Sequence, residues 1–157
     1  MKLTIPRSEL HRGLSRLQAI VEKRNSMPIL ANALLRATKG ERSQLEIAAT
    51  DLEVGLRGTH GADVSKAGSL TVSARKLFEI VRELPDEPVS LAATSNSYLE
   101  IQCNRVRFTL AGTAAEEFPM LPEVSPAALV RLPATVVANL IERTMYAASV
   151  DETRYNL

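Results

Sequence analysis

The sequence has one cysteine, no tryptophan and only 4% aromatic residues, and each shortage excludes a class of site. With Cys103 alone, the chain has neither an internal disulfide nor a zinc site built from several thiolates. Few aromatic side chains argue against a stacking platform for unpaired bases. No apolar run approaches the roughly 20 residues of a membrane span, and the first residues lack the apolar segment of a secretory signal. We therefore expect a cytoplasmic protein without a membrane partner.

The sequence also lacks a large net charge, because its 19 Lys and Arg residues nearly balance its 18 Asp and Glu residues. The overall balance therefore does not indicate a polyanion partner, and the placement of charges on individual elements must decide. The length of 157 residues is sufficient for a self-supporting core, since a chain of this size buries roughly two-thirds of its unfolded surface.

What the chain does have is a repeat. A short apolar strand leads directly into an amphipathic helix at three places, beginning at Leu3, Leu70 and Val130. Each junction contains Ser or Pro, which are typical of a helix start. A unit that recurs every 60–70 residues or so indicates a repeat architecture.

The helix predicted over residues 7–23 has two faces. At about 100° per residue, four apolar side chains form one stripe: Leu10, Leu14, Leu17 and Val21. Three basic side chains fall roughly opposite: Arg12, Arg16 and Lys23. This face binds something negative or is simply solvated, and the nearby Glu9 weakens its positive character.

Strands follow each helix, because apolar residues alternate along the sequence. In the first repeat these are residues 33/35/37, 45/47/49 and 52/54/56, followed by a loop over 58–68. A second helix over 74–84 has Leu77, Ile80, Val81 and Leu84 on one side and Arg75 and Arg82 on another. The spacing 99/101/103 and 106/108/110 then copies that of the last two strands of the first repeat.

This pattern predicts an α+β fold in which duplicated β-α-β-β-β units form an antiparallel sheet packed on two helices. We expect a first domain over 1–112, made of units 1–66 and 67–112, and a Pro-rich connector over 113–128. Residues 129–157 begin a third unit with a strand and a helix that cannot bury its own apolar face. The chain is therefore expected to be part of a longer protein.

Short motifs distributed over the whole chain resemble one known family. They are Met1-Lys2-Leu3-Thr4-Ile5, Pro28-Ile29-Leu30, Thr50-Asp51-Leu52-Glu53, Ala74-Arg75-Lys76-Leu77-Phe78, Arg105-Val106-Arg107-Phe108, Glu117-Phe118-Pro119 and Asp151-Glu152-Thr153-Arg154-Tyr155. In this order and spacing they are similar to the start of the bacterial DNA polymerase III beta subunits, the sliding clamps. The resemblance implies the DNA-clamp fold and a head-to-tail homodimeric ring around duplex DNA.

The resemblance also implies roles for particular residues. Arg24, Arg75, Tyr155 and Asn156 match positions that contact DNA, whereas Asp151 stands where relatives often have a neutral polar side chain. The dimer interface of the family matches Lys76, Arg105, Arg107, Phe108 and Leu110, although Phe108 is equally compatible with the core. Arg154 and Leu157 resemble the edge of the pocket where peptides of the polymerase catalytic subunit and the clamp loader dock. We expect 157 residues to contain neither a complete pocket nor a closed ring.

Two other classes remain open. A metal-dependent nuclease would need a carboxylate cluster, and Asp51 with Glu53 is the nearest candidate, since residues i and i+2 share a strand face. A sequence-nonspecific or regulatory DNA-binding domain would use one of the helices, and a regulator would need side chains suited to base edges. His11 and His60 are isolated in the sequence, and no phosphate loop, nucleophile motif or zinc spacing is present. We therefore expect a non-catalytic replication subunit without metal or cofactor, binding the DNA backbone without sequence preference.

Overall fold

The computed structural model describes residues 1–21, 27–122 and 130–148. The chain divides into two compact units, Met1–Leu121 and Pro122–Leu157. The strands of the first unit are β1 Lys2–Pro6, β2 Asn32–Thr38, β3 Gln44–Thr50, β4 Gly55–Gly61, β5 Asp63–Lys66, β6 Gly68–Ser73, β7 Pro88–Ala93, β8 Tyr98–Cys103 and β9 Val106–Thr113. Its helices are α1 Arg7–Leu17 and α2 Ala74–Glu83, with 3-10 turns η1 Pro28–Ala31 and η2 Ala115–Glu117. The second unit contains α3 Ala134–Thr144 and η4 Met145–Ala147.

The first unit is built on one antiparallel sheet with the strand order β4-β3-β2-β6-β9-β8-β7-β1-β5. The opening strand of each repeat pairs with the other repeat. Thus β1 pairs with β7, with Leu3 opposite Leu91, and β6 pairs with β2, with Leu70 opposite Leu35. The two repeats therefore complete each other's half of the sheet, and the predicted duplicated α+β fold is confirmed.

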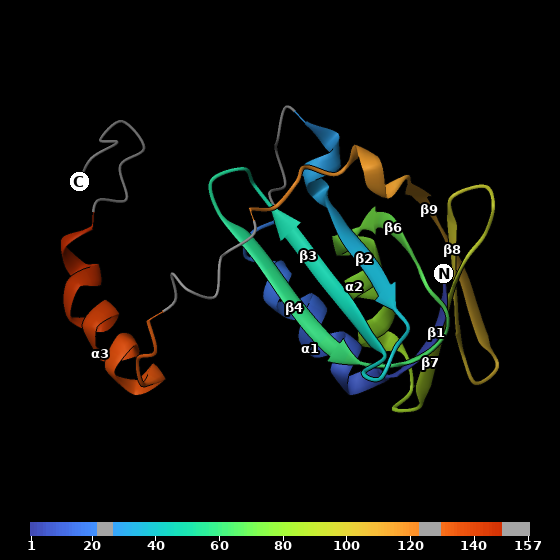
Figure 1. Cartoon of the computed structure of the whole chain (residues 1–157), viewed down its shortest axis with the longest axis horizontal. Helices are drawn as coiled ribbons and strands as arrows, with labels where there is room; N and C mark the ends of the chain where they lie inside the picture. The colour runs from blue at the N-terminus through green and yellow to red at the C-terminus, as the bar shows by residue number, and fades with distance from the viewer. Residues whose placement is uncertain (22–26, 123–129, 149–157) are drawn as a thin grey trace. The chain divides into compact units, whose positions relative to one another are not determined.

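Both helices lie on the same face of this sheet and pack side by side (Figure 1). Helix α1 contacts β1, β3 and β4, while α2 contacts β2 and β6. The leucine stripe of α1, namely Leu10, Leu14 and Leu17, is fully buried, as are Leu77 and Val81 of α2. These side chains belong to one hydrophobic cluster that includes strands from both repeats, so the two repeats share one core.

Two predicted boundaries in the first repeat were wrong. Helix α1 ends at Leu17 rather than continuing to residue 23. Residues 58–68 are not a loop, because they contain the second half of β4, all of β5 and the start of β6. Glycines and polar side chains are frequent there, yet β4 has β3 as a neighbour and β5 has β1, so pairing overrides the weak strand preference of those residues.

The predicted strand over 52/54/56 begins too early, because residues 51–54 form a turn and β4 begins only at Gly55. Asp51 Oδ1 accepts hydrogen bonds from the backbone N–H groups of Glu53 and Val54, at 2.9 and 2.6 Å. These hydrogen bonds lower the pKa of Asp51, and the one from Val54 has the largest effect. Leu52 adopts a φ of 82° and is 59% exposed, as expected for a side chain at the tip of a side-chain-stabilised turn.

The region after β9 shows both a confirmed helix and an absent strand. The expected helix is present as α3, but residues 130–133 form no strand, since nothing in the described part of the chain pairs with them. Leu140 and Ile141 on α3 are 58% and 55% exposed. Earlier in this region, Phe118 is buried in a small cluster with Leu34 and Ala48. None of the described helices is long and apolar enough to span a bilayer.

Candidate nucleic-acid interface

Helix α1 separates apolar and basic side chains as its sequence predicts. The leucines at 10, 14 and 17 have no exposed surface, whereas the side chain of Arg12 is 58% exposed and Arg16 is also exposed. Because the leucines are directed into the core, the two arginines project from the side of the helix that faces away from the sheet. Arg16 makes no ion pair within the described residues.

Helix α2 adds a second set of cations. Ser73 begins the helix, and its Oγ accepts from the backbone N–H of Lys76 at 3.4 Å. Arg75 is 63% exposed and pairs with Glu79 one turn later at 2.9 Å, and Arg82 pairs with the adjacent Glu83 at 2.9 Å. Exposed pairs of this kind contribute little stability, so both guanidinium groups remain available to another anion.

The two helices are joined by polar and ring contacts. Arg7, the first residue of α1, donates to the backbone carbonyls of Val81 and Arg82 at 3.1 and 2.6 Å, which satisfies carbonyl groups at the end of α2. His11 of α1 packs against Phe78 of α2, with ring centroids 5.2 Å apart. Beside this contact lies an open groove of about 460 Å³, lined by Gln18, Val21, Ala31, Ser73, Arg75, Phe78, Glu79 and Arg82.

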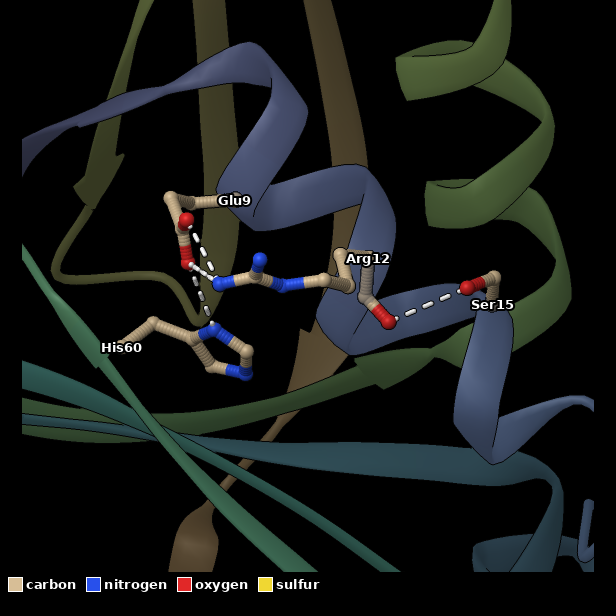
Figure 2. A network of polar contacts seen from close by, with 4 residues as sticks. All are labelled: Glu9, Arg12, Ser15 and His60. Atoms are coloured by element: carbon tan, nitrogen blue, oxygen red, sulfur yellow. Dashed lines mark hydrogen bonds and ion pairs between the residues drawn. The ribbon is translucent and has the colours of Figure 1, made fainter.

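A polar network that includes Glu9, Arg12 and His60 connects the basic face of α1 to the sheet (Figure 2). Arg12 Nη2 donates to both carboxylate oxygens of Glu9, each at 2.6 Å. Nδ1 of His60 lies 3.4 Å from Oε2 of the same carboxylate. The hydrogen bond with His60 and the positive charge of Arg12 lower the pKa of Glu9. His60 itself is only 6% exposed, because α1 covers it.

The residues expected at a dimer interface are exposed on β9, in the turn before it and on α2, with Leu110 partly buried against the core. Arg105 lies in the turn before β9, and Arg107 and Phe108 are on β9, where Phe108 is 41% exposed rather than in the core. Lys76 is exposed on α2. β9 pairs with β8 along residues 106–111 but with β6 only at Gly112 and Thr113, so one side of its first half has no partner strand among the described residues.

Several expected site residues lie outside the described residues: Lys23, Arg24, Asp151, Arg154, Tyr155, Asn156 and Leu157. The proposed Asp51–Glu53 metal pair is not a strand pair, since Asp51 is used by the turn described above. Among the residues that the structure describes, no group of three or more His, Cys, Asp or Glu side chains could hold a metal ion.

Residues 1–122 match the family described as "DNA polymerase III beta subunit, N-terminal domain". The chain belongs to this family. It is 38% identical to the "Beta sliding clamp" of Caulobacter vibrioides over all of its own length and 42% of that protein. The solved "Caulobacter crescentus pol III beta" covers 99% of the chain with a TM-score of 0.89, again over 42% of that protein.

A more distant member of the beta subunit family has the same fold. The DNA polymerase sliding clamp from Bacillus subtilis superposes with a TM-score of 0.90 at 25% identity, covering 98% of this chain and 42% of that one. The chain thus spans less than half the length of these relatives.

The structure adds three residues that the motifs of the beta subunit family did not reveal: Arg7, Glu9 and His60. The i to i+3 spacing of Glu9 and Arg12 was the available signal for the first part of the network. Nothing in the sequence links His60 to Glu9, because 51 positions separate them and only the packing of α1 on β4 brings them together.

Proposed function

We propose that the face formed by α1 and α2 binds the phosphate backbone of duplex DNA, and that the protein acts as the DNA-encircling subunit of a replicative polymerase. The observation that carries this proposal is the division of α1 into a buried leucine stripe and an exposed arginine face, next to a second helix with Arg75 and Arg82. Lys and Arg neutralise phosphates without reading bases, which suits a protein that moves along any sequence.

The length of the relatives supports a larger assembly. Because this chain spans 42% of them, the complete protein would have further two-repeat domains, forming a closed ring with a second copy. The unpaired part of β9, with the exposed Phe108, is suited to this contact, and Lys76, Arg105, Arg107 and Leu110 would lie around it. Domain boundaries at residues 112 and 129 remain part of the proposal.

In this assembly the protein is a non-catalytic cytoplasmic subunit. Its partners would be the polymerase catalytic subunit and the clamp loader, which would dock at a pocket that includes Arg154 and Leu157. Arg24, Tyr155 and Asn156 would contact the DNA together with Arg12, Arg16, Lys23 and Arg75. Ring closure would retain the DNA by topology, so individual contacts can stay weak.

The interface is tested by neutralising Arg12 and Arg16 together to Gln and measuring binding of a labelled duplex by fluorescence anisotropy over a salt series. We expect weaker binding, with the slope of log K against log salt reduced by about 0.9 for each phosphate that is no longer neutralised. The matched control neutralises Arg36 and Arg42, which are exposed on β2 and in the following turn rather than on the helices.

An equal loss in the control pair would mean that net charge alone acts, and unchanged binding in the α1 pair would contradict the proposal. Two unrelated duplexes should bind equally, whereas a preference would favour a regulatory DNA-binding domain. Cleavage of the duplex on addition of Mg²⁺ would favour the nuclease alternative.

A further inference from the structure

We propose that Glu9 is an internal competitor for Arg12, which limits the contact of Arg12 with DNA phosphates. This inference rests on the proposed binding of DNA by the α1–α2 face. It assigns an opposing role to a carboxylate within that face, so that the affinity of each contact is kept low.

The geometry makes Glu9 a substitute for a phosphate group. One terminal nitrogen of Arg12 donates to both oxygens of the Glu9 carboxylate at 2.6 Å, a short charge-assisted arrangement. A DNA phosphate would present the same type of anionic oxygens to the same donor. A phosphate that approaches this nitrogen must displace or share the Glu9 contact, and one that approaches another donor of the guanidinium meets a positive charge that Glu9 partly offsets.

His60 distinguishes this pair from the other ion pairs on the helices. Glu79 and Glu83 form ion pairs only with arginines of their own helix within the described residues. Glu9, in contrast, also faces a buried imidazole on β4, with Nδ1 of His60 3.4 Å from Oε2. The sheet therefore restricts the carboxylate to the position where it meets Arg12 (Figure 2). The side chain of Glu9 is itself only 31% exposed. A carboxylate held in place loses less conformational freedom in the pair than a mobile one.

The test is the isosteric substitution Glu9→Gln, measured by anisotropy of a labelled duplex in the full 157-residue chain. Removing the competing charge should tighten binding by roughly two- to fivefold at low salt, the range expected for one exposed ion pair. It should also steepen the salt dependence, since Arg12 then releases more counterion from the DNA. A merely structural role of Glu9 would not change this slope in that direction.

The matched control is Glu100→Gln on β8, which removes the same charge from the opposite face of the sheet, since its neighbours Leu99 and Ile101 are buried. The decisive variant combines Glu9→Gln with Arg12→Gln. If Glu9 acts through Arg12, the double variant should bind DNA no more tightly than Arg12→Gln alone. Thermal unfolding of each variant verifies that the fold is retained.

The two proposals fail in different ways. If neutralising Arg12 and Arg16 leaves DNA binding unchanged, the proposed interface is wrong. If that pair weakens binding but Glu9→Gln does not strengthen it, or strengthens it no more than Glu100→Gln, only the competitor role is wrong. A gain that persists without Arg12 would likewise overturn that role.

Discussion

Helices α1 and α2 follow the opening strands of the two repeats, yet they are attached to the rest of the molecule differently. Gly13 allows α1 to approach β4 closely enough to cover His60, and Glu9 reaches that histidine. The ion pairs of α2 stay within the helix and its C-terminal turn. The comparison shows that two helices built from the same sequence pattern can hold their charged side chains differently. In α1 the charged network contacts the sheet, whereas the ion pairs of α2 are exposed to solvent.

The close approach of α1 can be broken by Gly13→Ala. A Cβ at this position would lie 2.7 Å from Nε2 of His60 and 2.8 Å from Cδ1 of Ile47. Alanine favours helix by up to about 1 kcal/mol over glycine. The clash with buried side chains should nevertheless prevail and lower the free energy of unfolding by about 1–3 kcal/mol, as measured by denaturant titration.

The matched control for Gly13→Ala is Ser15→Ala on the exposed side of the same helix, which should change stability by less than about 0.5 kcal/mol. Combining Gly13→Ala with His60→Ala should recover part of the loss, because one of the two clashing side chains is removed. A stabilised Gly13→Ala variant would show that α1 can move away from β4 without cost.

The link between the helices can be broken by Arg7→Met, which keeps most of the apolar stem and removes both hydrogen bonds to the carbonyls of Val81 and Arg82. The expected loss is about 1–2 kcal/mol in the free energy of unfolding, since two acceptors at the end of α2 then depend on water. Amide hydrogen exchange should accelerate most in the last turn of α2. Uniform acceleration throughout the unit would instead indicate a global effect.

The smallest expected effect is the pH dependence of the contribution that Glu9 makes to the free energy of unfolding. Its pKa is lowered in the folded protein, chiefly by the hydrogen bond with His60 and then by Arg12. The stabilisation is therefore complete above the ordinary glutamate pKa of about 4.3, and it is lost as the pH falls through the lower folded-state pKa.

The unfolding free energies of wild type and Glu9→Gln should accordingly converge on acidification. Denaturant titrations over a pH series measure this difference, and carbon NMR of the Glu9 carboxylate gives its pKa directly. A difference that grows toward low pH would contradict the lowered pKa.

Much of the fold could be predicted because its signals are local. The spacing of Leu10, Leu14 and Leu17 predicts which side of α1 is buried, and Ser73 predicts where α2 begins. Local patterns failed where apolar residues lie exposed in a turn rather than in a strand. Leu52 and Val54 alternate like strand residues, but they lie in a turn, where the N–H of Leu52 donates to Thr50 Oγ1 and that of Val54 donates to Asp51 Oδ1.

In the candidate site, too, only the features with a local sequence signal could be predicted. The exposure of Arg12, Arg16 and Arg75 was predictable from helical spacing, whereas the burial of His60 was not. His60 lies in a segment rich in Gly and polar residues, and its environment depends on a helix encoded some 50 positions earlier.

By itself, the sequence determined the repeat, the two faces of each helix and the family, because periodicity and motif order are properties of neighbouring residues. Only the tertiary structure decided that β1 joins β7 and β6 joins β2, and that a buried histidine holds Glu9 against Arg12. The physical reason is that strand exchange and side-chain networks depend on how distant segments pack, and many pairings of apolar strands satisfy the same local pattern.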